Sequence, residues 1–451
     1  MTKSGITILK DGRAFVLSAV FILPITVNAQ SEFARNNYKL TLSEAVEFAK
    51  SQNKWVQAAN IEENAVAQER KDAYNNALPT VNISSSYQRF SDLTLFTQGL
   101  GHSTTAPRKP TANAANIGFD ALFNIYSGGK QHALEKEHNS RLKLAKLNSR
   151  DQSGSIALQT ANQYLDLVRL NDLQRFILDQ LKRAQTRLNN INSLYKNQKV
   201  TKSDVLRAEV TLANVELSLQ QNGNDIAITN QKLAVLINVP DSVQLSPVDS
   251  AGMPKPQISS LLPLIQTAGV SAYSVQKAFE NVEMQRSRLK GVQSSNRPSL
   301  NFYSAYGLNY PNYLFFPPVD QAYAVGFIGL KAQYSISSIY HNKGKVAAGK
   351  LRIKETEVQQ QAYSDNVRAE IQSYYIKYAE ALTRIFVNEH SVEQARVNYR
   401  IVNNKYLNQL SLLTDLLDAD NLYQESRFNL VKAQTDALTI YYHILYTSGN
   451  L

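Results

Sequence analysis

The stretch Leu78-Pro79-Thr80-Val81-Asn82-Ile83 occurs a second time, in altered form, as Arg297-Pro298-Ser299-Leu300-Asn301-Phe302. In each copy a proline ends a helical pattern and a polar–apolar alternation begins, as expected where a helix gives way to a strand. Further landmarks recur in the same order: Phe123–Ser127 with Tyr334–Ser338, Tyr195–Gln198 with Tyr406–Gln409, and Ser203–Leu206 with Thr414–Leu417. The chain therefore contains a duplicated unit, whose period of about 210 residues is too long for a solenoid repeat.

The duplication predicts two pseudo-equivalent halves joined by a connector. We expect the first structural repeat over residues 30–240 and the second over residues 258–451, each with a helix, two strands and a long helical hairpin. The connector, residues 241–257, lies in a region punctuated by prolines, which predicts an irregular segment outside the helices. These are Pro240, Pro247, Pro254, Pro256 and Pro263.

The first 29 residues are typical of an export signal. Three basic residues precede an apolar run over residues 14–27, and Val27-Asn28-Ala29 provides a small-residue cleavage site. The run is short and interrupted by Pro24, which disfavours a membrane anchor. No later stretch approaches 18 consecutive apolar residues, so we expect the exported chain to enter a membrane only through strands closed into a barrel.

Composition excludes several function classes. The chain has no cysteine, which rules out disulfides, thiolate metal sites and a lipid-bearing N-terminal cysteine. Its net charge of +11 comes from lysines and arginines spread along helices, so we expect a solvated surface and no nucleic-acid partner. The six histidines show no metal-ligand spacing, and no nucleophile elbow or phosphate loop occurs. We expect neither an enzyme nor a cofactor or metal site.

Long coiled-coil helices dominate each half. Apolar positions step by four and three residues along one seam: Ile177, Leu181, Ala184, Leu188, Ile191 and Tyr195. About 70 residues of such helix would reach roughly 100 Å, a length that suits a rod or tunnel. The returning helix has two adjacent apolar seams, which favours packing between two neighbours in a ring of helices. An ordinary two-helix hairpin, which needs one seam, is the alternative.

Each half also contains two strand candidates of about ten residues with period-2 alternation. They begin near Val81, Ile117, Leu300 and Tyr323, and the last extends to Ile336. Four strands cannot close a barrel, because about eight is the practical minimum, and open edges are not tolerated in lipid. We therefore expect the edges to pair with other copies of the chain. A soluble hairpin could produce the same alternation.

In this order, the landmarks resemble the TolC-like outer-membrane efflux proteins (outer-membrane factors) over nearly the whole exported chain. The best-matching segments are Leu40–Val46, Ala77–Val81, Tyr126–Lys130 and Val200–Glu209. The resemblance implies an α+β membrane protein in the outer membrane: a homotrimer with four strands per chain in a 12-stranded β-barrel embedded in outer-membrane lipid. It also implies a periplasmic α-helical tunnel that docks with a periplasmic adaptor (membrane fusion) protein and an inner-membrane pump.

The resemblance also implies roles for individual residues. Asp415 and Asp418 match two acidic residues, three apart, that form carboxylate rings at the channel constriction. Asp204 and Tyr406 match an aspartate and a tyrosine that link helix pairs in the closed state. Read from the residues alone, Asp204 and Asp415 are instead candidate N-caps of the returning helices, a role that can coexist with gating.

The hairpin tips are expected to dock the adaptor. The tip residues are Gln198, Lys199 and Val200 in the first half, and Gln409, Leu410 and Ser411 in the second. Glutamine stands at both tips where the family usually has glycine, and Ser411 stands where it usually has arginine. A further departure is Ile339-Tyr340, which replaces the Gly-Gly that follows the second strand of the first half.

The resemblance predicts the outer-membrane channel of a tripartite efflux or type I secretion system, gated at the periplasmic helix tips. The alternative is a periplasmic coiled-coil structural or adaptor protein. An adaptor would carry one helical hairpin with lipoyl-like or barrel domains, whereas this sequence predicts two hairpins and four strands.

Overall fold

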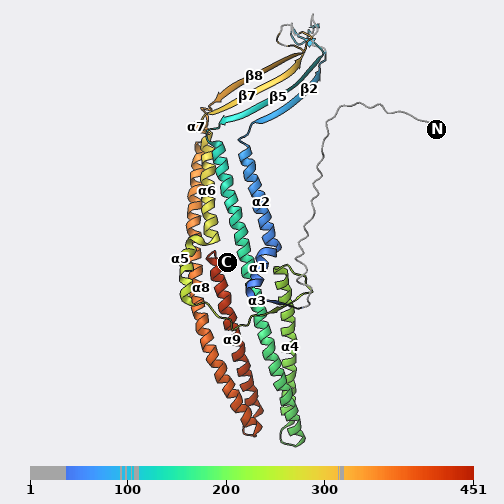
Figure 1. The fold of residues 1–451 in the computed structure, drawn as a ribbon, viewed down its shortest axis with the longest axis vertical. Helices are drawn as coiled ribbons and strands as arrows, with labels where there is room; N and C mark the ends of the chain where they lie inside the picture. The colour runs from blue at the N-terminus through green and yellow to red at the C-terminus, as the bar shows by residue number, and fades with distance from the viewer. Residues whose placement is uncertain are drawn as a thin grey trace, which may run out of the picture.

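The structure is a computed structural model that describes residues 37–451, except 92–93, 97–98, 103, 106–110, 313 and 315–318. The expected signal segment, residues 1–29, lies outside the described residues. The molecule is long and narrow, with a tilted β-sheet at one end and two helical hairpin tips at the other (Figure 1). Between them, a middle region holds the C-terminus and the short helices.

Four long helices run toward the tips. Helix α3 (Lys130–Lys196, 67 residues) turns back as α4 (Lys202–Leu236, 35 residues), and α8 (Lys343–Leu407, 65 residues) turns back as α9 (Leu413–Thr447, 35 residues). At 1.5 Å per residue, α3 and α8 are each about 100 Å long. The two hairpins contact each other through α3 and α9. The expected long coiled-coil helices are therefore present in both halves.

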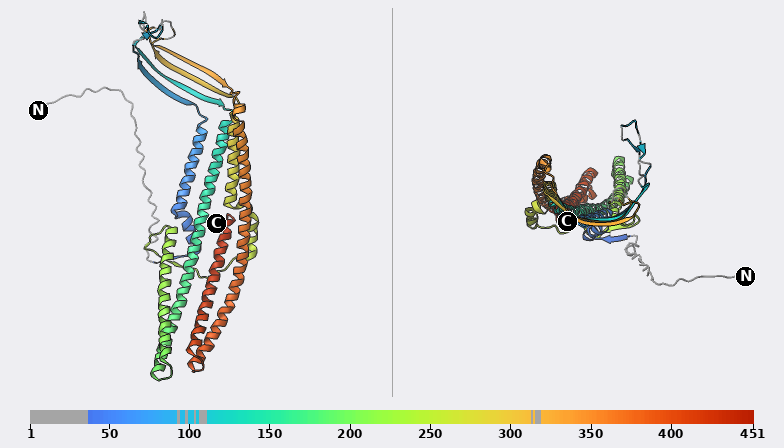
Figure 2. Two further views of the ribbon diagram at one scale, coloured as in Figure 1. Left: turned by 180° about the vertical axis from the view of Figure 1, so that it is seen from behind. Right: turned by 90° about the horizontal axis from the view of Figure 1, so that it is seen from above.

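The half of the molecule next to the sheet is also four helices wide. Here α2 (Lys54–Asn75) packs on α3, and α6 (Tyr273–Ser294) packs on both α3 and α8. The order is α2-α3-α6-α8 near the sheet and α4-α3-α9-α8 near the tips. Viewed along the long axis, these helices form a single curved layer (Figure 2). Helix α9 packs between α3 and α8, whereas α4, whose two apolar seams predict two neighbours, packs against α3 and leaves Leu206, Val210 and Leu217 of its second seam exposed in the described chain.

The sequence predicts one uninterrupted helix that begins at a capping box of Thr41 and Glu44 and runs to about Asn76, and this prediction is wrong in one respect. The chain forms α1 (Leu42–Gln52) and α2, separated at Asn53. The Asn53 amide caps two helices at once, because Oδ1 accepts from Trp55 N at 2.9 Å and Nδ2 donates to Leu236 O at 2.8 Å. The break thus links the start of α2 to the end of α4.

The sequence also predicts one helix from about Ile258 to Ser295, which ends before Pro298, and the structure divides this helix as well. It consists of a 3-10 turn η1 (Ile258–Leu261), α5 (Leu262–Ser271) and α6, with the break at Ala272. The C-terminal segment fits against this break, where Ser271 Oγ donates to Ser448 O at 2.7 Å. By length and composition, Ile258–Ser294 is the one described segment apolar enough to cross a membrane. The break divides its length, and its buried apolar residues Leu261, Ala268 and Val275 form one cluster with residues of α8 and α9.

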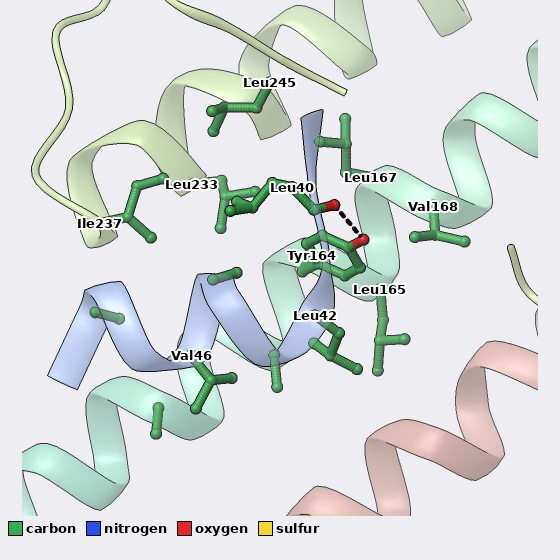
Figure 3. Packing of buried hydrophobic residues seen from close by; sticks show 14 of the residues in the cluster. Leu40, Leu42, Val46, Tyr164, Leu165, Leu167, Val168, Leu233, Ile237 and Leu245 are labelled. Carbon is green, nitrogen blue, oxygen red and sulfur yellow. Dashed lines mark hydrogen bonds between the residues drawn. The ribbon is translucent and has the colours of Figure 1, made fainter. Parts of the chain in front are cut away.

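The main hydrophobic core lies in the middle region (Figure 3). Strand β1 (Asn37–Leu40) pairs in parallel with β6 (Gln244–Pro247). The connector is predicted to be irregular, and this strand shows that part of it is regular. At the centre, the fully buried Tyr164 places its hydroxyl 2.7 Å from Leu40 O and 2.8 Å from Asp249 Oδ2. Burial and the Asp249 carboxylate raise the pKa of Tyr164, so the phenol stays protonated as a donor.

The sheet contains four antiparallel strands in the order β2-β5-β7-β8. They are β2 (Thr80–Arg89), β5 (Asn113–Tyr126), β7 (Ser299–Tyr310) and β8 (Tyr323–Gln333). Each half contributes two strands, and β5 joins β7 across the halves. The fourth strand ends at Gln333, three residues earlier than predicted. Short strands β3 (Thr94–Leu95) and β4 (Thr104–Thr105) pair beyond the sheet, and α7 (Ser338–His341) leads into α8.

Candidate functional site

The strand register collects apolar side chains on one face of the sheet. Because side chains alternate along a strand, the paired residues Ile83, Phe119 and Tyr306 share a face with every second residue of each strand. We call this the apolar face, and its members include Val81, Ile83, Ile117, Phe119, Phe123, Phe302, Tyr306, Leu308, Ile328 and Leu330. Among the described strand residues, its one charged side chain is Arg89, at the loop end of β2.

The opposite face, which we call the mixed face, has a different chemistry. It carries Asn82, Ser84, Ser86, Asn116, Gly118, Asp120, Leu122, Asn301, Tyr303, Ala305, Gly307, Phe327 and Lys331.

Large apolar residues on the apolar face are exposed in the single chain, Ile83 by 81% and Ile328 by 76%. Apolar surface of this extent on a sheet calls for a covering of lipid or protein. The sheet also ends in two edge strands, β2 and β8.

The first hairpin tip is built around a left-handed residue. Gln198 has φ of 56°, and the turn closes through Lys199 N donating to Leu194 O at 3.0 Å. Gln198 thus takes a left-handed conformation that favours glycine, at a cost of about 1 kcal/mol. Thr201 then caps α4 in a capping box, and Asp204 Oδ2 accepts from Thr201 N at 2.9 Å. Asp204 is therefore the third residue of the helix and not the N-cap itself.

The second tip repeats this backbone with other side chains. Gln409 has φ of 61°, and Leu410 N donates to Lys405 O at 2.9 Å. Asp415 Oδ2 accepts from Leu412 N at 3.0 Å and from Ser411 Oγ at 2.9 Å. These donors hold the pKa of Asp415 below its usual range. Ser411 thus supplies a hydroxyl to the helix start, because Leu412 at the cap position has none.

Asp415 and Asp418 both lie exposed on α9, opposite the buried Leu416. Residues three apart share one side of a helix, so the two carboxylates project together from the single chain. Asp415 is the third residue of α9 and not its N-cap as predicted, although its carboxylate accepts from the cap residue at the helix start.

Asp204 and Tyr406, 202 positions apart in sequence, line the same cavity of about 250 Å³ between the tips. Tyr406 belongs to α8 and packs against a small apolar cluster of α3, α4 and α9 that includes Ile191, Val205 and Leu417. Its hydroxyl oxygen is buried and has no hydrogen-bond partner within the described part of the chain. Burial, and secondly the negative charge of Asp204, raise the pKa of Tyr406. The two residues are brought together but are not hydrogen bonded.

A buried ion pair that sequence reasoning missed joins the two hairpins close to this cavity. Asp420 on α9 is 2% exposed, and its Oδ2 accepts from Arg187 Nη2 at 2.7 Å. Its Oδ1 accepts from Arg183 Nε at 3.2 Å. Both arginines are on α3, and Arg183 also lies 5.7 Å from the centre of the Tyr399 ring. One carboxylate therefore holds two cations between α3 and α9.

The signal for this ion pair is weak in the sequence. Asp420 follows Leu413 and Leu417 at the next step of an apolar seam, where a carboxylate is unusual. Arg183 and Arg187 are four apart and share one side of a helix. The sequence does not show that Asp420 pairs with these arginines, because the partners are more than 230 positions apart.

Comparison with solved structures identifies the fold. The outer membrane protein VceC from Vibrio cholerae superposes with a TM-score of 0.75 at 18% identity, covering 90% of this chain and 96% of that one. The Campylobacter jejuni outer membrane channel CmeC gives 0.73 at 16% identity, covering 99% and 94%. The open state of the Neisseria gonorrhoeae outer membrane channel MtrE gives 0.71 at 15% identity, covering 91% and 89%.

No protein-family model and no curated protein sequence matches the chain. The likeness therefore rests on three-dimensional structure. It covers almost the full length of both partners and includes the sheet, the long helices and the hairpins. The chain has the fold of the TolC-like outer-membrane channels, as the order of its sequence landmarks indicated.

Proposed function

We propose that this protein is an outer-membrane efflux channel, a passive exit duct that three copies of the chain form together. The observation that carries the proposal is the sheet: an apolar face continuous over four strands, with two edge strands, above helices about 100 Å long. Backbone groups at an edge must be paired in lipid, and three copies would close an even 12-stranded barrel. The apolar face then contacts lipid and the mixed face lines the lumen.

The helical layer supports the same assembly. It is curved and one helix thick, and its exposed apolar residues include Leu206, Val210 and Leu217 on α4. Three curved layers side by side would enclose a tunnel in the periplasm. We infer that the two structural repeats, residues 30–240 and 258–451, supply equivalent parts of its wall, with residues 241–257 in the connecting belt and residues 1–29 removed as the export signal.

The tunnel is gated at its tips. Three copies of Asp415 and Asp418 would place six carboxylates around the constriction, and a ring of like negative charges favours cations. Asp420 with Arg183 and Arg187 holds the second hairpin against the first, and Tyr406 with Asp204 lines the cavity beside that contact. Opening would separate the two hairpins and break these interactions.

The tips present the surface for a partner. Leu410 is 76% exposed, and Gln198 and Gln409 lie in the turns that join α3 to α4 and α8 to α9. We propose that Gln198, Lys199, Val200, Gln409, Leu410 and Ser411 dock a periplasmic adaptor protein, which connects the tunnel to an inner-membrane pump. The system is one of tripartite efflux or type I secretion.

The assembly is tested by purification from outer-membrane fractions. We expect a detergent-requiring trimer whose migration on gels shifts on heating and which conducts ions in planar bilayers. The rival proposal, a periplasmic coiled-coil structural or adaptor protein, predicts a folded monomer that stays soluble without detergent. That outcome would refute the barrel.

The constriction is tested with trivalent cations. Asp415→Ala combined with Asp418→Ala should abolish block of the wild-type channel by such cations and reduce cation selectivity, while trimers still assemble. If the double variant is blocked as strongly as the parent, these aspartates act at the helix start alone. The double variant Tyr406→Phe with Asp204→Ala should instead raise single-channel conductance, because it removes the carboxylate that accepts from Thr201 N at the start of α4 and the hydroxyl beside it in the closed tips.

A further inference from the structure

The mixed face of the sheet carries an aromatic pair. Tyr303 on β7 and Phe327 on β8 meet edge to face, with ring centroids 5.8 Å apart and an interplanar angle of 65°. The Tyr303 ring lies down against the sheet over Gly329, where an added Cβ would come within 2.7 Å of Tyr303 Cζ. Both rings remain accessible, Tyr303 by 38% and Phe327 by 54%. The glycine therefore permits an aromatic surface that lies flat along the sheet.

Small residues of the mixed face lie next to this aromatic pair. The strand register places Asp120, Ala305 and Phe327 in one row across β5, β7 and β8. The next row contains Gly118 paired with Gly307. With strands about 4.8 Å apart, Asp120 and Phe327 stand roughly 10 Å from each other, across small side chains. The result is a shallow cradle with a carboxylate on one side and an aromatic ring on the other.

The charge of this cradle is negative. Asp120 accepts from Asn82 Nδ2 at 3.0 Å through one carboxylate oxygen, which orients the group along the sheet. Within the described strand residues, Lys331 is the one other charged side chain on the mixed face. It stands four residues from Phe327 along β8, about 13 Å away. This exceeds the screening length of about 8 Å at physiological salt, so Asp120 dominates the local field.

We infer that the cradle formed by Asp120, Tyr303 and Phe327 binds amphiphilic aromatic cations during their passage through the barrel. A cation is attracted both to the carboxylate and to aromatic ring faces, while the aromatic part of the ligand stacks on the exposed rings. An aliphatic cation cannot stack on the rings, and an aromatic anion is repelled by the carboxylate. The inference rests on the proposed function, since the mixed face must line the lumen, and it adds a substrate class to that function.

Block of the open channel tests the inference. Tetraphenylphosphonium is added on the loop side of planar bilayers containing wild-type trimers, and tetramethylammonium and tetraphenylborate serve as probes that lack the rings or reverse the charge. We expect half-block at the lowest concentration with tetraphenylphosphonium. In Phe327→Leu combined with Tyr303→Leu that concentration should rise about tenfold. Asp120→Asn should bring the half-block concentrations of tetraphenylphosphonium and tetraphenylborate closer together, because it removes the negative charge that distinguishes them.

The control is Tyr323→Leu, which removes an aromatic ring from the same face of β8, four residues from Phe327 and about 13 Å away. It should leave block by tetraphenylphosphonium unchanged. The inference is overturned if the aromatic double variant is blocked like the parent, or if Tyr323→Leu weakens block as much. A protein that conducts but is not blocked refutes this inference alone, whereas one that forms no channel refutes the proposed function as well. Heat-modifiable migration of each variant verifies that trimers have formed.

Discussion

The two hairpin ends share a backbone but differ in side chains. Each turns through a glutamine with positive φ, and each returning helix has an aspartate at its third residue, Asp204 or Asp415. The residues that follow differ between the halves. Arg207 in α4 corresponds to Asp418 in α9, and the exposed Glu209 corresponds to the buried Asp420.

This difference indicates that the two duplicated halves have different roles. The local requirements of a tight helical turn are met twice, because they depend on backbone geometry alone. The exposed carboxylate pair lies on α9, and Asp420 of the same helix pairs with Arg183 and Arg187 of the first hairpin, because α9 packs against the long helix of the other hairpin. We infer that the second hairpin carries the gate and that the first serves as its fixed support. Substitutions at one end, with the equivalent position at the other end as reference, test this division.

The largest effect is expected from Asp420→Asn. Removing this carboxylate leaves Arg183 and Arg187 without their buried partner, which costs about 3–5 kcal/mol when one member of a buried pair is lost. The corresponding change in the first hairpin, Glu209→Gln, affects an exposed side chain and should change stability by less than about 0.5 kcal/mol. Thermal unfolding followed by circular dichroism measures both. Equal effects would show that the halves are not differentiated at this position.

The next effect concerns the helix starts. Thr201→Ala removes the hydroxyl that accepts from Asp204 N at 3.2 Å and donates to Asp204 Oδ2 at 2.8 Å, and it should cost about 1 kcal/mol. Ser411→Ala removes a hydroxyl that contacts Asp415 while the backbone donor of Leu412 remains, so the cost should be about 0.5 kcal/mol. Unfolding midpoints of the two variants under one condition give the comparison, and a larger loss for Ser411→Ala would contradict it.

A smaller and opposite effect is expected at the turns. Gln198→Gly and Gln409→Gly relieve left-handed strain, and the greater freedom of glycine in the unfolded chain offsets part of the gain. Each should stabilise by roughly 0.5 kcal/mol and by the same amount in both halves. Destabilisation by either variant would mean that the glutamine side chain makes a contact that outweighs the strain.

The smallest effect depends on pH. Hydrogen bonds from Leu412 N and Ser411 Oγ lower the folded-state pKa of Asp415. A lowered pKa stabilises the fold above the unfolded-state value, and this stabilisation is lost as pH falls through the folded-state value. The stability difference between wild type and Asp415→Asn should therefore be complete at about pH 6 and shrink on acidification below about pH 4. A difference that grows on acidification would reverse the assigned sign.

Much of this architecture was predictable from local sequence patterns. The heptad seam around Ile177 and Ala184 predicted the long helices, and the period-2 segments after Pro79 and Pro298 predicted β2 and β7. These patterns suffice because helix and strand periodicity are properties of short segments. The order of the landmarks then indicated the fold that the solved structures share.

The features that were not predictable depend on distant partners. Asn53 ends α1 because its amide reaches Leu236 O, 183 positions away. Asp420 becomes a buried ion-pair residue only because α3 lies beside α9. A local sequence pattern does not specify which distant residues will be neighbours. Equivalent positions of the two repeats also have different neighbours in the structure.

The edge strands β2 and β8 must pair between copies of the chain if the barrel is to close. With no native cysteine, disulfide formation between introduced pairs gives a direct measurement of this pairing. Asn82, Ser84 or Ser86 is changed to Cys in turn, each together with Val325→Cys on the same face. Within one chain β2 and β8 are three strand spacings apart, about 14 Å, beyond the reach of a disulfide. We expect covalently linked trimers for at least one pair in native membranes. Monomers throughout the scan, with a monomeric mass in detergent, would contradict the trimeric barrel.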